Sequence, residues 1–92
     1  MIPDNELVKN ILAGNKGSYS YLVNKYKNMV FSICFRILDN REEAEDVAQE
    51  VFEKAYFSLN KHKSHESKFS NWLYRIAYTR SISKNVNLNF KK

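Results

Sequence analysis

No glycine or proline occurs after Gly17, so the chain from there to Lys92 lacks the residues that most often interrupt helices. An all-β domain of this size would need turn residues between its strands, and such residues are scarce here. Apolar residues instead recur at steps of three and four, the period of one helical face. Hydrophobic residues make up 43% of the 92, enough to bury a core. We therefore predict an all-α fold, a compact bundle of four helices in a single domain.

Two helices are predicted in the first half of the chain. The first begins after Asp4, a good N-cap residue, and ends at Gly14. Asn15 can cap the second, a long helix that ends at Asp39. Its inward face is expected to contain apolar residues and the only cysteine: Leu22, Val23, Tyr26, Val30, Ile33, Cys34 and Ile37. A single cysteine excludes a disulfide within the chain, so we expect Cys34 to be a small core residue.

Two more helices are predicted in the second half. Asn40, with Glu43 three residues later, approximates a capping box that opens the third helix. Residues 60–67 are polar and without period, which predicts a loop, and Ser67 can cap the fourth helix. We expect that helix to fade after Ile82. Residues 1–84 would then form the domain, and residues 85–92 a frayed or disordered tail.

Charge is divided unevenly along the chain. Residues 39–53 contain seven acids and one base, a local charge of −6, whereas residues 54–92 contain nine bases and one acid, a local charge of +8. Such a split suggests two partners, a basic protein surface for the first segment and phosphate for the second. Charge alone leaves an alternative open, in which the segregated charges simply form a solvated surface.

Motifs for catalysis are absent from the sequence: it has no glycine-rich phosphate loop and no HExxH pattern. We therefore expect no enzyme activity, no cofactor and no metal site. Asp46 and Glu50 are expected to lie on a solvated helix face, and His62 and His65 in an exposed loop. No apolar run reaches the roughly twenty residues of a membrane span, and the N-terminus does not resemble a secretory signal. A cytoplasmic protein without membrane insertion is expected.

The last third of the chain combines basic and aromatic residues. Cations that follow a phosphate backbone, set beside rings on which unpaired bases stack, are typical of single-strand binding. On a helix, Asn71, Arg75 and Tyr78 would lie near one line, with further polar and aromatic residues close by: Tyr74, Thr79 and Arg80. Phe69 and Trp72 suit either a base-stacking role or a plain core role, and the sequence leaves both open.

Two sequence blocks resemble region 2 of extracytoplasmic-function (ECF) sigma factors. The first is NREEAEDVAQEVF at residues 40–52, and the second, after a short polar loop, is KFSNWLYRIA at residues 68–77. The upstream Leu7-Val8, Gly14-Asn15 and residues 22–26 also fit the opening helices of that family. The resemblance covers about residues 4–84. It implies a small helical domain that directs bacterial RNA polymerase to promoters.

By this resemblance, the acidic third helix docks on the coiled-coil clamp helices of the largest polymerase subunit. The matched contact positions are Asp46, Gln49, Glu50, Phe52 and Tyr56. A negative face that includes a glutamine also suits charge-assisted hydrogen bonds to arginines. An anti-sigma factor is a further candidate partner of such a domain.

The loop and the fourth helix resemble the part of the family that captures a base flipped out of the minus-ten promoter element, on the non-template strand. Extrusion costs roughly a few kcal/mol, which a pocket and a basic channel would offset. The candidates for this role are Asn60, Lys61, Lys63, Lys68, Phe69, Ser70 and Asn71. The upstream duplex edge would be faced by Arg75, Thr79, Arg80 and Lys84. The acidic flank of helix three and the cationic flank of helix four are thus expected to be separate docking surfaces.

Some positions depart from the ECF pattern. Tyr78-Thr79 stands where an Arg-Asn pair is common, Ser83 stands where Asp is common, and residues 79–82 are similar to primary sigma factors. The family's helix-turn-helix domain, which reads the minus-thirty-five element, is also not found in the 92 residues. The chain is therefore expected to be either a fragment of a longer factor or a natural single-domain protein. A second function stays open: a truncated sigma-like module that binds polymerase or an anti-sigma factor without opening DNA.

Overall fold

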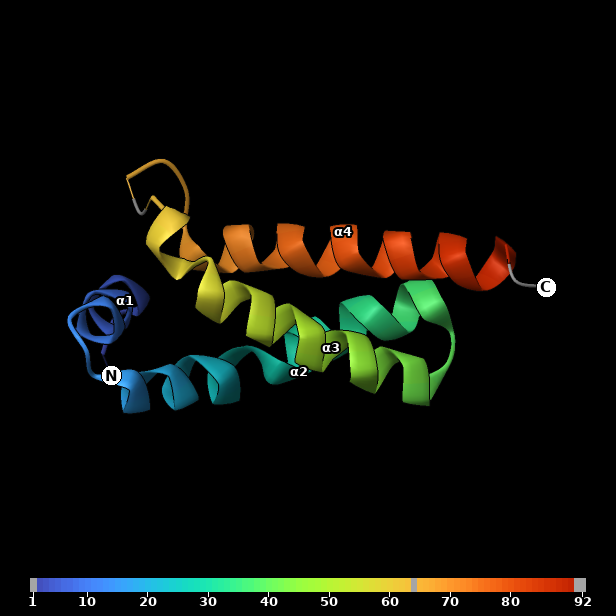
Figure 1. Cartoon of the computed structure of the whole chain (residues 1–92). Coiled ribbons are helices and arrows are strands. Elements are labelled where there is room, and N and C mark those ends of the chain that lie inside the picture. The colour runs from blue at the N-terminus through green and yellow to red at the C-terminus, as the bar shows by residue number, and fades with distance from the viewer. Residues whose placement is uncertain (1, 64, 91–92) are drawn as a thin grey trace.

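The structure, a computed structural model, describes residues 2–63 and 65–90. All of its helices and helical turns follow in chain order: α1 (Asp4–Leu12), η1 (Lys16–Ser18), α2 (Tyr19–Leu38), α3 (Arg41–Phe57), η2 (Leu59–Lys61) and α4 (Phe69–Phe90). The molecule is elongated, with extents of 45 × 22 × 18 Å. In Figure 1, α4 runs along one side of the bundle beside α3, and α1 lies at the end opposite the C-terminus. The predicted all-α fold of four helices is confirmed.

The first helix begins differently from the prediction. Pro3 occupies the N-cap position, and its carbonyl accepts the amides of Glu6 and Leu7. Asp4 is therefore not a cap but the first helical residue. Its carboxylate accepts hydrogen bonds from Lys25 Nζ at 2.8 Å and from the Tyr26 hydroxyl. This link between α1 and α2 explains why a residue suited to capping is used for tertiary contact instead.

Turn residues define the junctions between the first three helices. Gly14 follows Ala13, the C-cap residue of α1, with a φ of +111°, a conformation that only glycine adopts without strain. Asn15 precedes η1 but makes no side-chain cap hydrogen bond, so its predicted capping role is wrong. Asp39 closes α2 in the left-handed conformation, with a φ of 51°. The Asn40 side chain then accepts the amide of Glu43 at 3.0 Å, which confirms the predicted cap of α3.

The core lies between α2, α3 and α4, with α1 closing one end. Leu22, Val30 and Cys34 of α2 are fully buried, as the helical period predicted. Ala44, Val47, Val51 and Ala55 form the inner stripe of α3, and Leu73 and Ala77 belong to that of α4. Because Cys34 is 0% exposed, the prediction of a core cysteine is confirmed.

The fourth helix is longer than predicted. It continues to Phe90 instead of fading after Ile82, so the expectation of a frayed tail is wrong for residues 85–90. Residues 91–92, the remainder of that tail, lie outside the described residues. The half-buried Leu88 packs against the core near the C-terminal end of α4. This contact extends the inward stripe of α4 by two turns beyond Ser81. The asparagine-rich sequence from residue 85 onward shows no sign of this extension.

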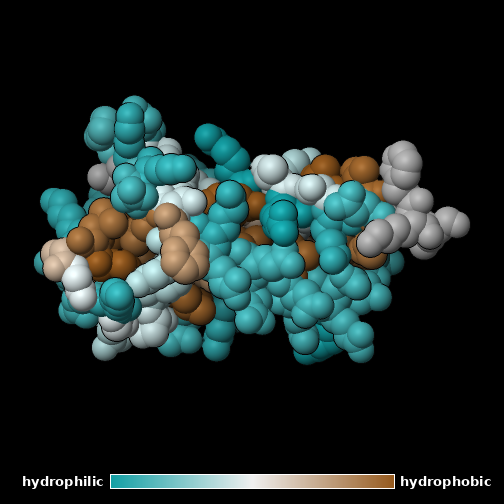
Figure 2. Space-filling view, viewed as in Figure 1, coloured by the Kyte–Doolittle hydropathy of each residue, from teal (hydrophilic) through white to brown (hydrophobic). Residues whose placement is uncertain are grey.

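The surface is mostly polar in the view of Figure 2, where hydrophilic residues cover much of α3 and hydrophobic residues gather near α1 and along α4. Among the described side chains of α4, the large exposed apolar ones are Tyr74, Tyr78, Ile82 and Val86. Among the residues that the structure describes, no helix combines the length and the apolar character needed to cross a bilayer.

Candidate functional site

The outer face of α3 carries polar side chains that the fold leaves open. Asp46 and Gln49 are exposed, and Glu50 is half-buried. Gln49 Nε2 donates to Glu53 Oε1 at 3.4 Å, a long contact within the same helix. These side chains point away from the core stripe because they fall between its apolar positions. The face therefore offers carboxylates and an amide to a partner.

An apolar groove adjoins this polar face. The half-buried Phe52 and Tyr56 line it together with Tyr19 and Val23 of α2, and the cavity volume is about 400 Å³. The Tyr19 hydroxyl donates to the Phe52 carbonyl oxygen at 2.6 Å, and its ring meets the edge of Tyr56 with centroids 5.1 Å apart. Burial, with the nearby Tyr56 adding to it, raises the pKa of Tyr19. The hydroxyl therefore stays a neutral donor that fixes α2 to α3.

Four residues that line this groove were not predicted as contacts, namely Tyr19, Val23, Glu53 and Phe57, and Phe57 is the most exposed apolar one. Its side chain is 80% exposed at the C-terminal end of α3 and lines the same groove. A signal was present, since Phe57 lies four residues after Glu53 and therefore on the outward polar face. A large exposed aromatic residue on a helix that already buries a full inner stripe indicates a contact surface.

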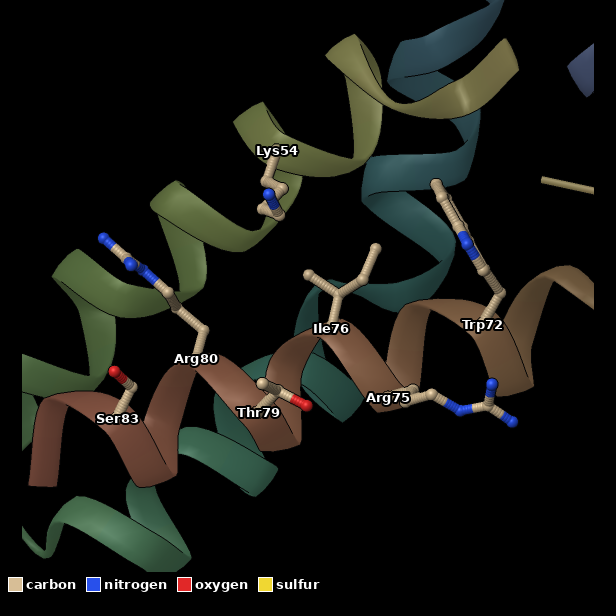
Figure 3. Close-up of a pocket in the computed structure, with 7 residues that line it drawn as sticks. All are labelled: Lys54, Trp72, Arg75, Ile76, Thr79, Arg80 and Ser83. Atoms are coloured by element: carbon tan, nitrogen blue, oxygen red, sulfur yellow. The ribbon is translucent and has the colours of Figure 1, made fainter. Parts of the chain in front are cut away.

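A second groove opens between α3 and α4, with a cavity volume of about 410 Å³. Three predicted residues meet there: Arg75, Thr79 and Arg80. The groove also contains four residues that were not predicted as contacts: Lys54, Trp72, Ile76 and Ser83. Figure 3 shows Lys54 pointing from α3 toward α4, whereas Arg75 extends outward. The indole and Ile76 give the groove an apolar wall between cationic side chains.

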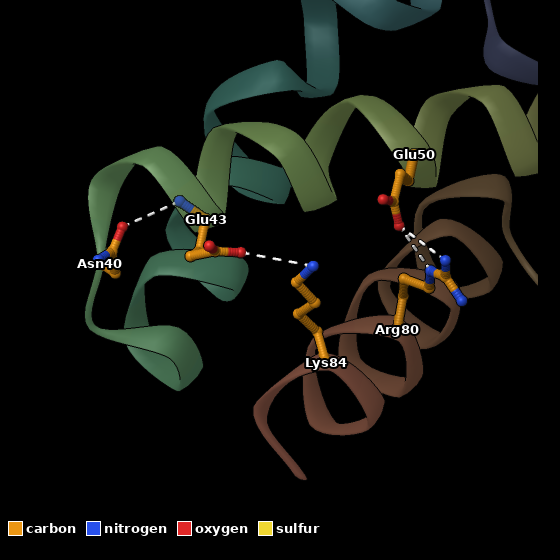
Figure 4. Close-up of polar contacts among 5 residues, drawn as sticks. All are labelled: Asn40, Glu43, Glu50, Arg80 and Lys84. Carbon is orange, nitrogen blue, oxygen red and sulfur yellow. Dashed lines mark hydrogen bonds and ion pairs between the residues drawn. The ribbon is translucent and has the colours of Figure 1, made fainter. Parts of the chain in front are cut away.

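Two ion pairs join the acidic and cationic flanks, contrary to the expectation that these flanks are separate. Arg80 donates from Nε to Glu50 Oε2 at 2.8 Å, and its Nη2 lies 2.8 Å from the same oxygen (Figure 4). Lys84 Nζ lies 3.5 Å from Glu43 Oε2. The reason is that α3 and α4 pack side by side, so the inner rims of both flanks face each other. Sequence periodicity alone does not show which helices are neighbours.

Arg75 and Lys54 differ from these paired cations. Neither forms an ion pair with a side chain in residues 2–63 or 65–90, and both are exposed. In the part of the chain that the structure describes, no hydrogen bond or ion pair joins Asp46 or Gln49, on the outer rim of α3, to α4. The two surfaces therefore meet at the Glu50–Arg80 and Glu43–Lys84 pairs, and a further hollow at their border is lined by Lys54, Phe57 and Arg80. Asp46 and Gln49 lie on one side of this border and Arg75 on the other.

The loop before α4 holds most of the remaining predicted contacts. Of the contacts predicted in the loop and at the start of α4, five are exposed and Ser70 is half-buried; the exposed five are Asn60, Lys61, Lys63, Lys68 and Asn71. Phe69 is only 1% exposed and packs against Tyr26 and Trp72, with centroids 5.7 and 5.8 Å away. Of its two interpretations, the core role is the one that the structure supports. Phe69 fixes the loop and is not open to direct contact.

His62 is buried, although the sequence suggested an exposed loop residue. It is 8% exposed, and its ring centroid lies 5.1 Å from that of Trp72 and 5.8 Å from that of Phe69. Neither ring nitrogen has a hydrogen-bond partner in the described part of the chain. Burial lowers the pKa of His62, so the neutral imidazole is favoured. His65, in contrast, is exposed, with Nε2 at 3.8 Å from Glu66.

Comparison with known proteins places these surfaces in a family context. The family model described as sigma-70 region 2 matches residues 22–84. The ECF RNA polymerase sigma factor SigW of Bacillus subtilis is 38% identical over 77 residues, which cover 84% of this chain and 41% of that protein. The RNA polymerase sigma-H factor of Pseudomonas aeruginosa is 40% identical over 74 residues, with 80% and 38% covered. The chain thus spans about two fifths of the length of these relatives.

A solved structure agrees over nearly the whole length. It is the NMR structure of an engineered region 2 of sigmaE in complex with GTAAAA, which superposes with a TM-score of 0.88 at 32% identity. The match covers 98% of this chain and 93% of that one. The arrangement of helices that creates both grooves is therefore that of the related domain.

Proposed function

The chain belongs to the sigma-70 region 2 family, and from this premise we propose that it directs bacterial RNA polymerase to promoters and helps to open the minus-ten element. In this proposal the outer face of α3 binds polymerase, and the loop and α4 bind DNA. Neither role requires chemistry at a reacting centre, so the domain acts by binding and catalyses no reaction.

One observation carries the polymerase half of the proposal. Asp46 and Gln49 are exposed beside an apolar groove that ends at the 80% exposed Phe57. A partner with arginines beside apolar side chains would contact both the polar face and the apolar groove. The partner that the family implies is the pair of coiled-coil clamp helices of the largest polymerase subunit. The contact set is Asp46, Gln49, Glu50, Phe52 and Tyr56, to which we add Phe57. Charge-assisted hydrogen bonds would give specificity, and the groove would bury apolar area.

The DNA half of the proposal rests on the cations of the loop and of α4. Lys61, Lys63 and Lys68 are exposed at one end of α4, and Arg75 is exposed further along it. Such a row would follow the phosphates of the non-template strand after the loop captures an extruded base. Thr79, Arg80 and Lys84 would meet the upstream duplex edge. The ion pairs with Glu50 and Glu43 hold two of these side chains in place before DNA arrives.

Binding to the isolated clamp coiled coil tests the polymerase half. We expect Asp46→Arg and Gln49→Ala to abolish this binding without unfolding the domain, because both side chains are exposed and leave the core intact. Glu66→Arg makes the same charge change as Asp46→Arg in the distant loop and should bind normally. Retention of full affinity in both α3 variants would contradict the proposal.

A second function is supported by different residues. Arg80 and Lys84, which would face duplex DNA, are both ion-paired to residues of α3. In addition, Tyr78, Thr79 and Ser83 depart from the ECF pattern. The domain would then bind polymerase or an anti-sigma factor without opening DNA. Run-off transcription by the chain joined to a sigma DNA-reading domain separates the two functions. Open-complex formation would exclude the second one.

A further inference from the structure

Tyr74 and Tyr78 form an exposed aromatic pair on α4. They are 48% and 49% exposed, and their rings are nearly parallel, with planes at 10° and centroids 6.4 Å apart. Within residues 2–63 and 65–90, no side-chain hydrogen bond of either hydroxyl is found. Neither ring belongs to the core or to the packing layer around it. The fold therefore does not account for two large rings at this place.

The spacing of the two rings matches that of a stacked ligand. Successive bases in a stacked strand are about 3.4 Å apart, so a flat base between two rings needs ring planes about 7 Å apart. Four residues of helix rise about 6 Å, and the ring centroids of Tyr74 and Tyr78 lie 6.4 Å apart with nearly parallel planes, a distance of the same order. Both side chains are exposed, so their torsions are free to rotate and bring the two rings face to face about a base.

The surroundings favour a nucleic acid over a neutral apolar ligand. Arg75 lies next to Tyr74 in the chain, is exposed, and forms no ion pair within the described residues. Of the other rings in the basic third of the chain, Phe69 is 1% exposed and Trp72 is half-buried. Among the side chains that the structure describes on α4, Tyr74 and Tyr78 are thus the rings most open to an unpaired base.

We propose that the Tyr74–Tyr78 pair binds one unpaired base of single-stranded DNA between its rings, with Arg75 holding an adjacent phosphate. This inference rests on the proposed function, because promoter opening supplies the unpaired strand. It adds a second stacking site to the base capture assigned to the loop. Base–aromatic stacking accepts any base, so the pair would strengthen binding without selecting sequence.

Fluorescence anisotropy with the 92-residue chain and no polymerase tests this site. The probes are a short fluorescein-labelled oligothymidine and a strand of equal length whose central bases are replaced by abasic sites. Loss of one stacked base should weaken oligothymidine binding about tenfold in the Tyr74→Leu/Tyr78→Leu variant, with little change for the abasic strand. Tyr74→Phe/Tyr78→Phe keeps both rings and should bind oligothymidine as the unmodified chain does. Tyr21→Leu, which removes an exposed ring from α2, should also bind normally.

Three results would overturn the inference: no binding of oligothymidine by the unmodified chain, unchanged affinity in the leucine double variant, or an equal loss for both strands. The last result would mean that the change acts on the phosphate contacts or on the fold. Because polymerase is absent from this assay, clamp binding is measured separately. Normal clamp binding with a failed stacking test rejects the tyrosine site alone and leaves the proposed function standing.

Discussion

His62 is a buried imidazole whose two nitrogens lack hydrogen-bond partners in the described part of the chain. It packs against Phe69 and Trp72, so protonation would place an uncompensated charge in an aromatic cluster. The nearest charged groups in the sequence, Lys61 and Lys63, are both exposed cations and offer the imidazolium no compensation. The residue therefore links the conformation of the loop to protonation.

Burial lowers the pKa of His62 below its usual 6.5, so the unfolded state binds this proton more readily than the folded state. The stability that it contributes should be fully present above about pH 6.5 and be lost as pH falls toward the folded-state pKa. Urea unfolding between pH 8 and 5 measures this loss. His62→Phe should flatten the slope, whereas His65→Gln should keep it. Equal slopes in the unmodified chain and in His62→Phe would show that other groups control the acid sensitivity.

The junction between α2 and α3 depends on one side-chain hydrogen bond. Asn40 accepts the Glu43 amide at 3.0 Å, directly after the left-handed Asp39. Asn40→Ala should lower the free energy of unfolding by about 1 kcal/mol, because it removes the partner of an amide at the start of α3. Asn40→Ser keeps an acceptor and should be nearly neutral. Chemical denaturation compares the three proteins, and an alanine variant as stable as the original would contradict the capping role.

For the individual helices, the spacing of apolar residues in the sequence predicted where helices occur better than it predicted where they begin and end. The inner stripe of α2 and the cap at Asn40 follow from the spacing of apolar residues and from the chemistry of one amide. The start of α1 did not follow, because Asp4 serves a contact with Lys25 and Tyr26 that lies more than twenty residues away in the sequence. The end of α4 was misjudged because the contribution of Leu88 depends on tertiary packing.

For the whole molecule, the relation between helices decides which surfaces are available. Charge segregation in the sequence predicted an acidic and a cationic flank, but not that α3 and α4 are neighbours. Their packing joins Glu50 to Arg80 across the border, and at half-exposed positions such a pair contributes only about 1 kcal/mol or less. Its main effect is to set the position of Arg80 beside the groove.

Two surfaces on one small domain would allow protein and DNA to be held at once. One surface is the outer face of α3, which ends at Phe57. The other is the groove between α3 and α4, which is lined by Arg75 and Thr79 of α4. A chain with these surfaces would couple polymerase binding to strand capture through a rigid helical core. The domain would thus contact polymerase through one surface and promoter DNA through the other.

Site-specific photocrosslinking in the complete complex of polymerase and promoter tests this claim most directly. A photoreactive phenylalanine analogue is placed either at Phe57 or at Thr79, and the crosslinked partner is identified for each position. We expect the first position to crosslink to the largest polymerase subunit and the second to promoter DNA. Crosslinking of Phe57 to DNA, or of both positions to the same partner, would contradict the two-surface account.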